Sequence, residues 1–467
     1  MTPPKKNIVE GLLIRWFVCA LVACALLAPR AAAAQSLGST CTTPGELAWS
    51  GYLLACAESG TFRYALHDDV PPAPEGGYVE RPEWYPRLGD IFRTMHAPAC
   101  PTSGRVTFTH PVIRLADVIP IIPQGAMIGD HVTPIDHGYI GITPLTKARA
   151  GRTEADYVPV YAPADAEVIE VSLLGSPRSI RVVMAHGCEV YSIYMVLNRL
   201  SGALAHLQDD LLTERQLRPY LRILAGTEFA EGRDNPPDFS VHDGTRWLSG
   251  LSAPFSYTSS DAWKPYTVDP WPYFSPDLAA AYEAKMQRLE PPRWGRIDYD
   301  IAGTAAGTWF LAGTIGYSGR LVRDFESGER LRGGEVPGKL TYAWSHLAIA
   351  RHQVQPGRWL FSVGWWADER GDPKQYLLEV RTGQPQPSEL TAASGIVVYR
   401  LWSWMHATTG ASDAPQPIGY EIAPARMQGL AAIQVNGDGT LGVEVMPGAE
   451  DPAAFRGFTA AKRSYRR

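Results

Sequence analysis

The sequence has little of what marks a nucleic-acid-binding protein or a disordered chain. Its 467 residues carry 43 Lys and Arg against 48 Asp and Glu, so the net charge is -5 and we expect no nucleic acid as a partner. Charged residues amount to 19% and hydrophobic residues to 45%, which excludes a disordered polar chain. The sequence also has no heptad array and no internal repeat, so coiled-coil and solenoid folds are excluded.

What is abundant favours β structure. The chain has 44 Gly, 39 Pro and 10% aromatic residues, a composition typical of short strands joined by many turns. A chain of this length is expected to form two or three domains. We therefore predict a mostly β protein with a few helices, in which an antiparallel β-sheet domain precedes a second β-sandwich or barrel domain.

The first residues are typical of a signal peptide. Two lysines precede an uncharged apolar run over residues 16–27, and Ala31–Ala34 offer a small-residue cleavage site. The run is too short for a transmembrane helix, which needs roughly 20 apolar residues. We expect residues 1–34 to be removed and the protein to be secreted or periplasmic. The alternative is a lipoprotein, because the sequence ending at Cys24 resembles a bacterial lipobox. The membrane is a partner only in that case.

The mature chain is expected to be acidic, with paired cysteines. Residues 1–34 hold four of the 43 basic and one of the 48 acidic residues, so their removal leaves a net charge of -8 and no basic stripe for phosphates. The four remaining cysteines form no CxxC pair, which argues against a thiolate zinc site and for disulfides. We prefer Cys41 with Cys56, leaving Cys100 with Cys188, although other connectivities stay open.

Changes in pattern divide the mature chain into four parts. We expect an irregular N-terminal region that packs on the core (35–110), a first β domain (111–250), a connecting region with a helix (251–290) and a C-terminal β-rich domain (291–467). Ser275 followed by Pro276 predicts the start of the connecting helix, because serine is a good N-cap and proline suits the first helical position.

Two imidazoles and two carboxylates lie close together in the first β domain, at Asp130, His131, Asp136 and His137. Imidazole and carboxylate groups are ligands that zinc prefers. The same side chains also form hydrogen-bonded turns without a metal. Asp238, which precedes an apolar stretch, is by itself an ordinary turn or capping acid. Both interpretations stay open.

Further segments follow this cluster in a fixed order. They are Val158–Asp165 (VPVYAPAD), His186-Gly187 in a hairpin turn, Tyr194-Met195-Val196 and Pro236–Val241. Together they resemble the β-sheet core of lysostaphin-type zinc endopeptidases, which cleave peptide cross-links in bacterial cell walls. The resemblance spans about residues 110–245 and implies a lysostaphin-like antiparallel β-sheet core domain.

The resemblance implies zinc as the cofactor and a set of ligands. His131 matches the first ligand of the family and Asp136 the second, although the family usually has a slightly shorter spacing between them. Asp238 stands at the position of the third ligand, and His137 is a nearby substitute. A catalytic zinc needs three protein ligands and an open position for water. These side chains would supply the three ligands.

The resemblance also implies that the catalytic groups are missing. Val196 and Pro236 occupy the two positions at which the family carries catalytic histidines. A general acid or base contributes roughly 10²–10⁴-fold to the rate. We therefore assign no catalytic residue and predict a pseudoenzyme that binds cell-wall peptidoglycan, a surface glycan or a protein without efficient hydrolysis. The alternative is an active zinc metallohydrolase with a rearranged site.

A second resemblance covers most of the mature chain. Thr133–His137, Asp238–Val241 and Tyr299–Phe310 are similar to segments of exported bacterial proteins of unassigned function, a resemblance that implies no activity. The C-terminal domain also holds tryptophans that would either stack on sugars in a glycan-binding module or fill a core. These are Trp359, Trp365, Trp366, Trp402 and Trp404.

Overall fold

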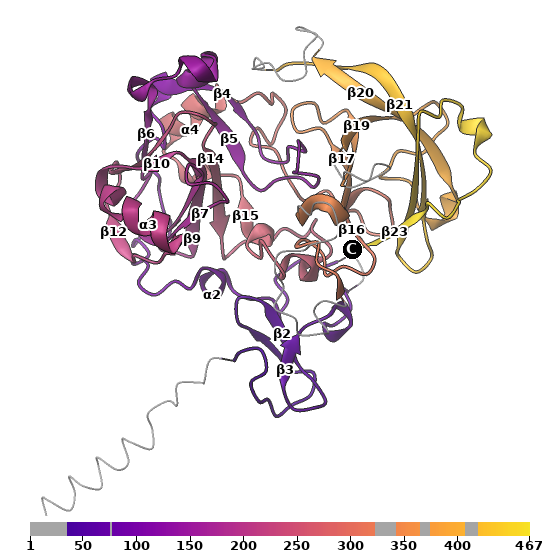
Figure 1. Ribbon diagram of the computed structural model, residues 1–467, viewed down its shortest axis with the longest axis horizontal. Coiled ribbons are helices and arrows are strands. Elements are labelled where there is room, and N and C mark those ends of the chain that lie inside the picture. The colour runs from indigo at the N-terminus through magenta and orange to yellow at the C-terminus, as the bar shows by residue number, and fades with distance from the viewer. Residues whose placement is uncertain (1–34, 75–76, 323–341, 365–373, 407–418) are drawn as a thin grey trace, which may run out of the picture.

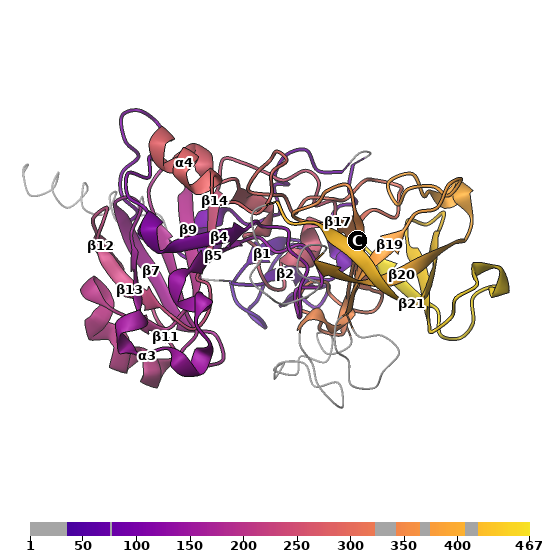
Figure 2. The ribbon, with the colours of Figure 1, turned by 90° about the horizontal axis from the view of Figure 1, so that it is seen from above.

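Antiparallel β-sheets dominate the protein, which confirms the mostly β fold class. The computed structural model describes residues 35–74, 77–322, 342–364, 374–406 and 419–467. In this part a nine-stranded sheet, two three-stranded sheets and a closed barrel are joined by loops and short helices. Figures 1 and 2 show the sheet region and the barrel side by side, with a small lobe at their junction. None of the described helices is long and apolar enough to cross a membrane. The expected leader (1–34, with Cys24), Trp365 and Trp366 lie outside the described residues.

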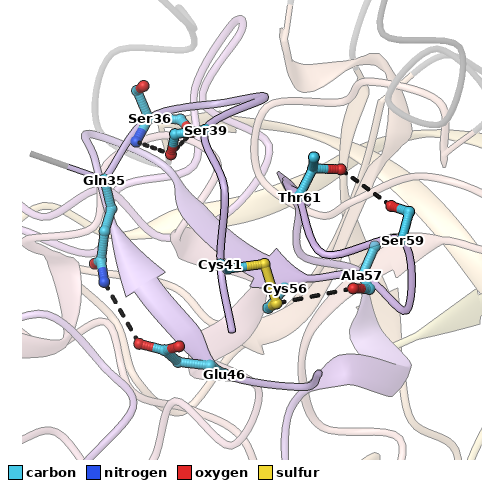
Figure 3. The surroundings of a disulfide bond; sticks show 9 residues. All are labelled: Gln35, Ser36, Ser39, Cys41, Glu46, Cys56, Ala57, Ser59 and Thr61. Atoms are coloured by element: carbon cyan, nitrogen blue, oxygen red, sulfur yellow. Dashed lines mark hydrogen bonds between the residues drawn. A yellow bond between two sulfur atoms is a disulfide. The ribbon is translucent and has the colours of Figure 1, made fainter. Parts of the chain in front are cut away.

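The small lobe is a three-stranded sheet of β1 (Leu47–Trp49), β2 (Leu53–Cys56) and β3 (Phe62–Tyr64). A disulfide between Cys41 and Cys56 ties the chain before β1 to the end of β2 (Figure 3). A second disulfide joins Cys100 to Cys188, so both preferred pairings are confirmed. Two disulfides indicate an oxidising, extracytoplasmic location.

The nine-stranded sheet carries the predicted site. Its order is β11-β7-β8-β9-β14-β5-β4, while β12 pairs with β7 and β15 with β14, and all of these pairs are antiparallel. The strands are β4 (Val118–Ile122), β5 (Gly138–Ile142), β7 (Ala166–Leu173), β8 (Ile180–Ala185), β9 (Val190–Leu197), β11 (Gln216–Leu217), β12 (Leu221–Ile223), β14 (Asp238–Asp243) and β15 (Thr267–Val268).

One face of this sheet packs on the larger hydrophobic core. Side chains alternate along a strand, so Phe239 and Val241 of β14 both enter this core, next to Tyr194 of β9. A second sheet and the helix that follows Ser275, as predicted, complete it. These elements are β6 (Val158–Tyr161), β10 (Arg199–Leu200), β13 (Glu228–Gly232) and α4 (Pro276–Glu283), with α3 (Gln208–Glu214) nearby in the chain.

The N-terminal segment covers the opposite face. Tyr85 and the short helix α2 (Leu88–Phe92) pack against the inner strands β7, β8 and β9. The disulfide between Cys100 and Cys188 fixes this segment to the turn between β8 and β9. The face on which Asp238 lies is therefore covered by the N-terminal segment together with the loop around Trp263, on which Phe92 stacks.

The C-terminal domain is a closed antiparallel barrel, which selects the barrel over the sandwich. Strand β16 pairs with both β17 and β23 and closes the ring. Trp309 and Phe361 are among the buried residues of its core. The strands are β16 (Gly307–Leu311), β17 (His346–Arg351), β18 (Trp359–Val363), β19 (Lys374–Glu379), β20 (Val397–His406), β21 (Ile422–Val435), β22 (Leu441–Pro447) and β23 (Arg463–Arg466).

Asp300 joins the barrel to the preceding region. One of its oxygens accepts hydrogen bonds from the backbone N and the Oγ of Ser252, at 2.8 and 3.0 Å. The other accepts from the backbone N of Thr308 in β16 at 2.7 Å. Gly307 has a φ of 123°, and a Cβ there would lie 2.3 Å from the Asp300 carboxylate. The segment Tyr299–Phe310 is thus a structural joint.

Candidate functional site

The register of β5 and β14 brings three of the four predicted ligands together. Asp238 at the start of β14 lies opposite Tyr139 of β5. Asp136 and His137 directly precede β5, so they reach the same end of the strand pair. The sequence pattern therefore identified a true spatial cluster.

His137 lies between the two carboxylates. Its Nδ1 donates to Oδ1 of Asp136 at 3.0 Å, and its Nε2 is 3.4 Å from Oδ2 of Asp238. The exposed fractions are only 4% for Asp136 and His137 and 6% for Asp238. Charged groups at this depth are stable only when they are paired, which is the arrangement observed.

Asp136 is also held by two residues that the sequence analysis missed. The Lys264 Nζ lies 3.2 Å from Oδ1, and the Trp263 indole donates to Oδ2 at 2.8 Å. Lys264 begins the 3₁₀ turn Lys264–Tyr266 and is 2% exposed. Its ammonium also lies 4.8 Å from the centre of the Tyr317 ring. Both oxygens of Asp136 are thus occupied by donors from the protein.

The electrostatics of the cluster follow from these contacts. Burial raises the pKa of Asp238 to about 7, and the negative charge of Asp136 adds to this effect. Burial opposes ionisation of Asp136 too, but Lys264 and the hydrogen bond from His137 outweigh it and hold its pKa well below the usual range. The two carboxylates likewise outweigh burial at His137 and raise its pKa. His137 and Asp238 therefore compete for one proton beside an ionised Asp136.

His131, the fourth predicted ligand, touches the cluster from the side. Its half-buried ring meets the ring of His137 edge to face, with the centroids 5.6 Å apart. Burial, together with the positive charges of His137 and Lys264, lowers the pKa of His131 to about 3. We therefore expect a neutral imidazole at this position at pH 7.

A further histidine on the same face went unrecognised in the sequence. Asp238, Ser240 and His242 alternate along β14 and so share one side of the sheet. The ring nitrogens of His242 lie 2.9 Å from Oγ of Ser240 and 3.3 Å from Oγ1 of Thr267. Burial lowers its pKa to about 4. Both nitrogens have partners within the protein, which indicates a structural role.

The two positions expected to have lost catalytic histidines lie close to Asp238 along the chain or across the sheet, Pro236 two residues before it and Val196 next to its partner Met195. Met195, next to Val196, lies directly opposite Asp238, so β9 places an apolar thioether at that register position. Val196 has a φ of 57°, at a point where the register of β8 and β9 shifts. A β-branched residue rarely adopts this conformation, which costs about 1–3 kcal/mol.

As the side chains lie, they form a hydrogen-bonded network. In the described part of the chain, no group of three or more His, Cys, Asp or Glu is arranged to hold a metal ion. Asp136 already accepts from three donors, one of them the cationic Lys264. Nε2 of His137 and Oδ1 of Asp238 are buried without a hydrogen-bond partner among the described residues. The zinc site at His131, Asp136, His137 and Asp238 stays a prediction.

The described tryptophans of the barrel differ in their surroundings. Trp359 is buried, its indole donates to Gln386 at 2.6 Å and the guanidinium of Arg351 covers its ring at 3.8 Å. Trp402 is half-buried and donates to Glu379 at 2.9 Å. Both line a hollow of about 490 Å³ on the barrel. The Trp402 ring could therefore stack on a sugar, whereas the face of Trp359 that Arg351 covers could not.

Comparison of the chain with known protein families, with curated proteins and with solved structures found no match. The geometry of the site thus carries the interpretation of its function.

Proposed function

We propose that the protein is an exported binding protein in which a degenerate lysostaphin-type sheet serves as a scaffold rather than as a peptidase. Its ligand is cell-envelope material, either peptidoglycan or a surface glycan or protein. The observation that carries the proposal is the burial of Asp136, His137 and Asp238, with the Trp263 ring held between Asp136 and the disulfide-tethered N-terminal segment.

The physical reason is access. A zinc peptidase needs an open coordination position and a cleft that admits an extended peptide. Here Trp263 bonds to Asp136 and its ring stacks on Phe92 of the covering segment, with the centroids 5.8 Å apart. The disulfide at Cys100 holds that segment in place. A substrate carbonyl reaches His137 only if this cover is displaced.

The proposed location is secreted or periplasmic, with residues 1–34 removed. A lipoprotein attached through Cys24 is the alternative. Mass spectrometry of the mature N-terminus separates them, because processing near Ala34 leaves no acyl group and lipidation leaves one on Cys24.

Peptidoglycan hydrolysis and metal content test the proposal together. We expect the purified mature protein to sediment with isolated cell walls and to release no soluble fragments, with or without added zinc. One bound zinc per chain and measurable release, both lost in His137→Ala and kept in the exposed control His206→Ala, would overturn it. That result would establish the rearranged hydrolase, which the unpartnered atoms of His137 and Asp238 favour.

A further inference from the structure

A hollow of about 620 Å³ lies where the small lobe, the sheet and the barrel domain meet. This volume is within the range of sites for small ligands, about 300–1,000 Å³. The turn between β1 and β2, the end of α2, strands β8 and β11, the loop 259–263 and residues near the start of the barrel all line it. Residues from three regions of the fold therefore form this hollow together.

Positive charge is concentrated in this hollow. Its lining residues include four arginines and one carboxylate, which are Arg93, Arg181, Arg218, Arg320 and Asp261. The whole chain carries a net charge of -5, so the composition gives no reason to expect this concentration. Arginines gathered in a concave site favour anionic ligands, because their planar forks match carboxylate and phosphate groups.

Two of the arginines are held in fixed positions by one acid. Glu170 accepts from Arg181 with one oxygen and from Arg218 with the other, the latter at 2.8 Å. Arg218 also donates to the backbone oxygen of Phe92 at 3.1 Å. Glu170 alone cannot neutralise two guanidinium groups. Asp261 also interacts with Arg181, but burial raises the pKa of its carboxyl and so disfavours its negative charge. In the described residues, Nε of Arg181 is buried without a hydrogen-bond partner.

Aromatic rings complete the lining. Trp49, Tyr52 and Trp263 contribute to the wall, and the Arg181 guanidinium lies 5.6 Å from the centre of the Trp263 ring. Flat apolar faces beside fixed cations suit a ligand that has a ring or a planar group next to its charge.

We infer that this hollow binds a small anionic ligand, one that carries a carboxylate or a phosphate beside a sugar ring or a planar group. The inference rests on the proposed function, because it makes the hollow the place where envelope material is held. Acidic muropeptides and phosphorylated sugars share the required chemistry.

Arg93 is the residue that tests the inference most cleanly. It is exposed at the end of α2, and its Nη2 lies 3.2 Å from where a Cβ of Gly51 would be, at the turn between β1 and β2. No ion pair of its side chain is found within the described residues. Arg93→Gln therefore removes a charge without breaking a bond of the fold. Arg178→Gln, on the exposed turn between β7 and β8, is the matched control.

Isothermal titration of the full mature chain uses three probes: muramyl dipeptide, glucose 6-phosphate and the neutral N,N′-diacetylchitobiose. We expect at least one anionic probe to bind and chitobiose to bind much more weakly. Arg93→Gln should weaken binding of the anionic probe about tenfold, because one charged hydrogen bond is lost, and Arg178→Gln should leave binding unchanged. The anionic probe that binds identifies carboxylate or phosphate as the ligand group.

The inference is overturned if neither anionic probe binds, if chitobiose binds equally well, or if Arg93→Gln binds like the wild type. Its failure differs from failure of the proposed function. If the protein sediments with cell walls but binds no probe, only the assignment of the hollow as the ligand site is wrong. If the wild-type protein does not sediment with cell walls, the proposed binding function is wrong as well. Circular dichroism of each variant checks that the fold is intact.

Discussion

One tryptophan separates two polar regions of opposite character. On one side the indole of Trp263 donates to Asp136 in the buried cluster with His137, Asp238 and Lys264. On the other, its ring lines the arginine hollow. The cluster is buried and pairs its charges internally, whereas the hollow presents several cations to solvent.

Reactive side chains alone therefore do not define a ligand site. The cluster holds the residue types of a zinc centre, yet its contacts with Trp263 and Lys264 indicate that these residues stabilise the fold. The hollow has no motif, but its charge is accessible and partly unneutralised. We therefore expect changes in the cluster to affect stability and changes in the hollow to affect binding.

The largest effect is expected for Lys264→Met. This change leaves the ionised Asp136 buried without its cation, and breaking such a pair costs about 3–5 kcal/mol. Urea unfolding at neutral pH measures the loss. The control is Lys147→Met, because Lys147 is 54% exposed in its surface pair with Asp156 and should cost at most about 1 kcal/mol. Equal effects of the two variants would contradict the structural role of the cluster.

Removal of the disulfide between Cys100 and Cys188, the tether of the N-terminal segment, is expected to have the next largest effect. Replacing both Cys100 and Cys188 by serine should lower the free energy of unfolding by about 2–4 kcal/mol, because the bond closes a long loop. Hydrogen exchange should also accelerate across α2, the covering helix. The same replacement at Cys41 and Cys56 should leave exchange of α2 unchanged, because that bond lies within the small lobe. Unchanged exchange after loss of the tether would show that packing alone keeps the cluster covered.

A smaller effect, with a defined sign, is expected for Asp238→Asn. Burial raises the pKa of Asp238 to about 7, so the folded chain keeps a proton that the unfolded chain releases above its usual pKa of 3.8. The resulting stability is complete below the unfolded pKa and is lost as the pH rises through about 7. Asparagine does not titrate, so the stability of the variant relative to wild type should rise by roughly 1–3 kcal/mol from about pH 4.5 to about pH 7.5. Urea unfolding across this range measures the difference in stability between variant and wild type. For the control Asp277→Asn, at an exposed position, this difference should not change with pH. A fall with pH in Asp238→Asn would contradict the assignment.

The strands and the disulfide between Cys41 and Cys56 could be predicted because local features determine them. Composition and turn residues indicated a mostly β protein with a barrel as one alternative, and an even count of cysteines with short spacing indicated Cys41 with Cys56. The sequence places Asp136 beside His137, and the resemblance to lysostaphin-type enzymes added Asp238. Pairing of β5 with β14 brings the three together, because it places their strand ends side by side.

The partners of that cluster could not be predicted in the same way. Trp263 is 127 residues from Asp136 in the sequence, and no local pattern indicates which distant loop packs on a strand end. His242 was within reach, because strict alternation from Asp238 places it on the same face. The arginine hollow left no sequence signal, since its cations come from separate segments and only tertiary packing unites them.

The smallest effect on stability is expected for Arg93→Gln. Its side chain is exposed, so the free energy of unfolding should change by no more than about 0.5 kcal/mol, while anionic probe binding falls. Urea unfolding of Arg93→Gln and of Lys264→Met under the same conditions compares the two changes in the free energy of unfolding. A loss of more than about 1 kcal/mol would mean that Arg93 also supports the packing of α2. The hollow would then share the structural role of the cluster, and accessibility would no longer separate the two regions.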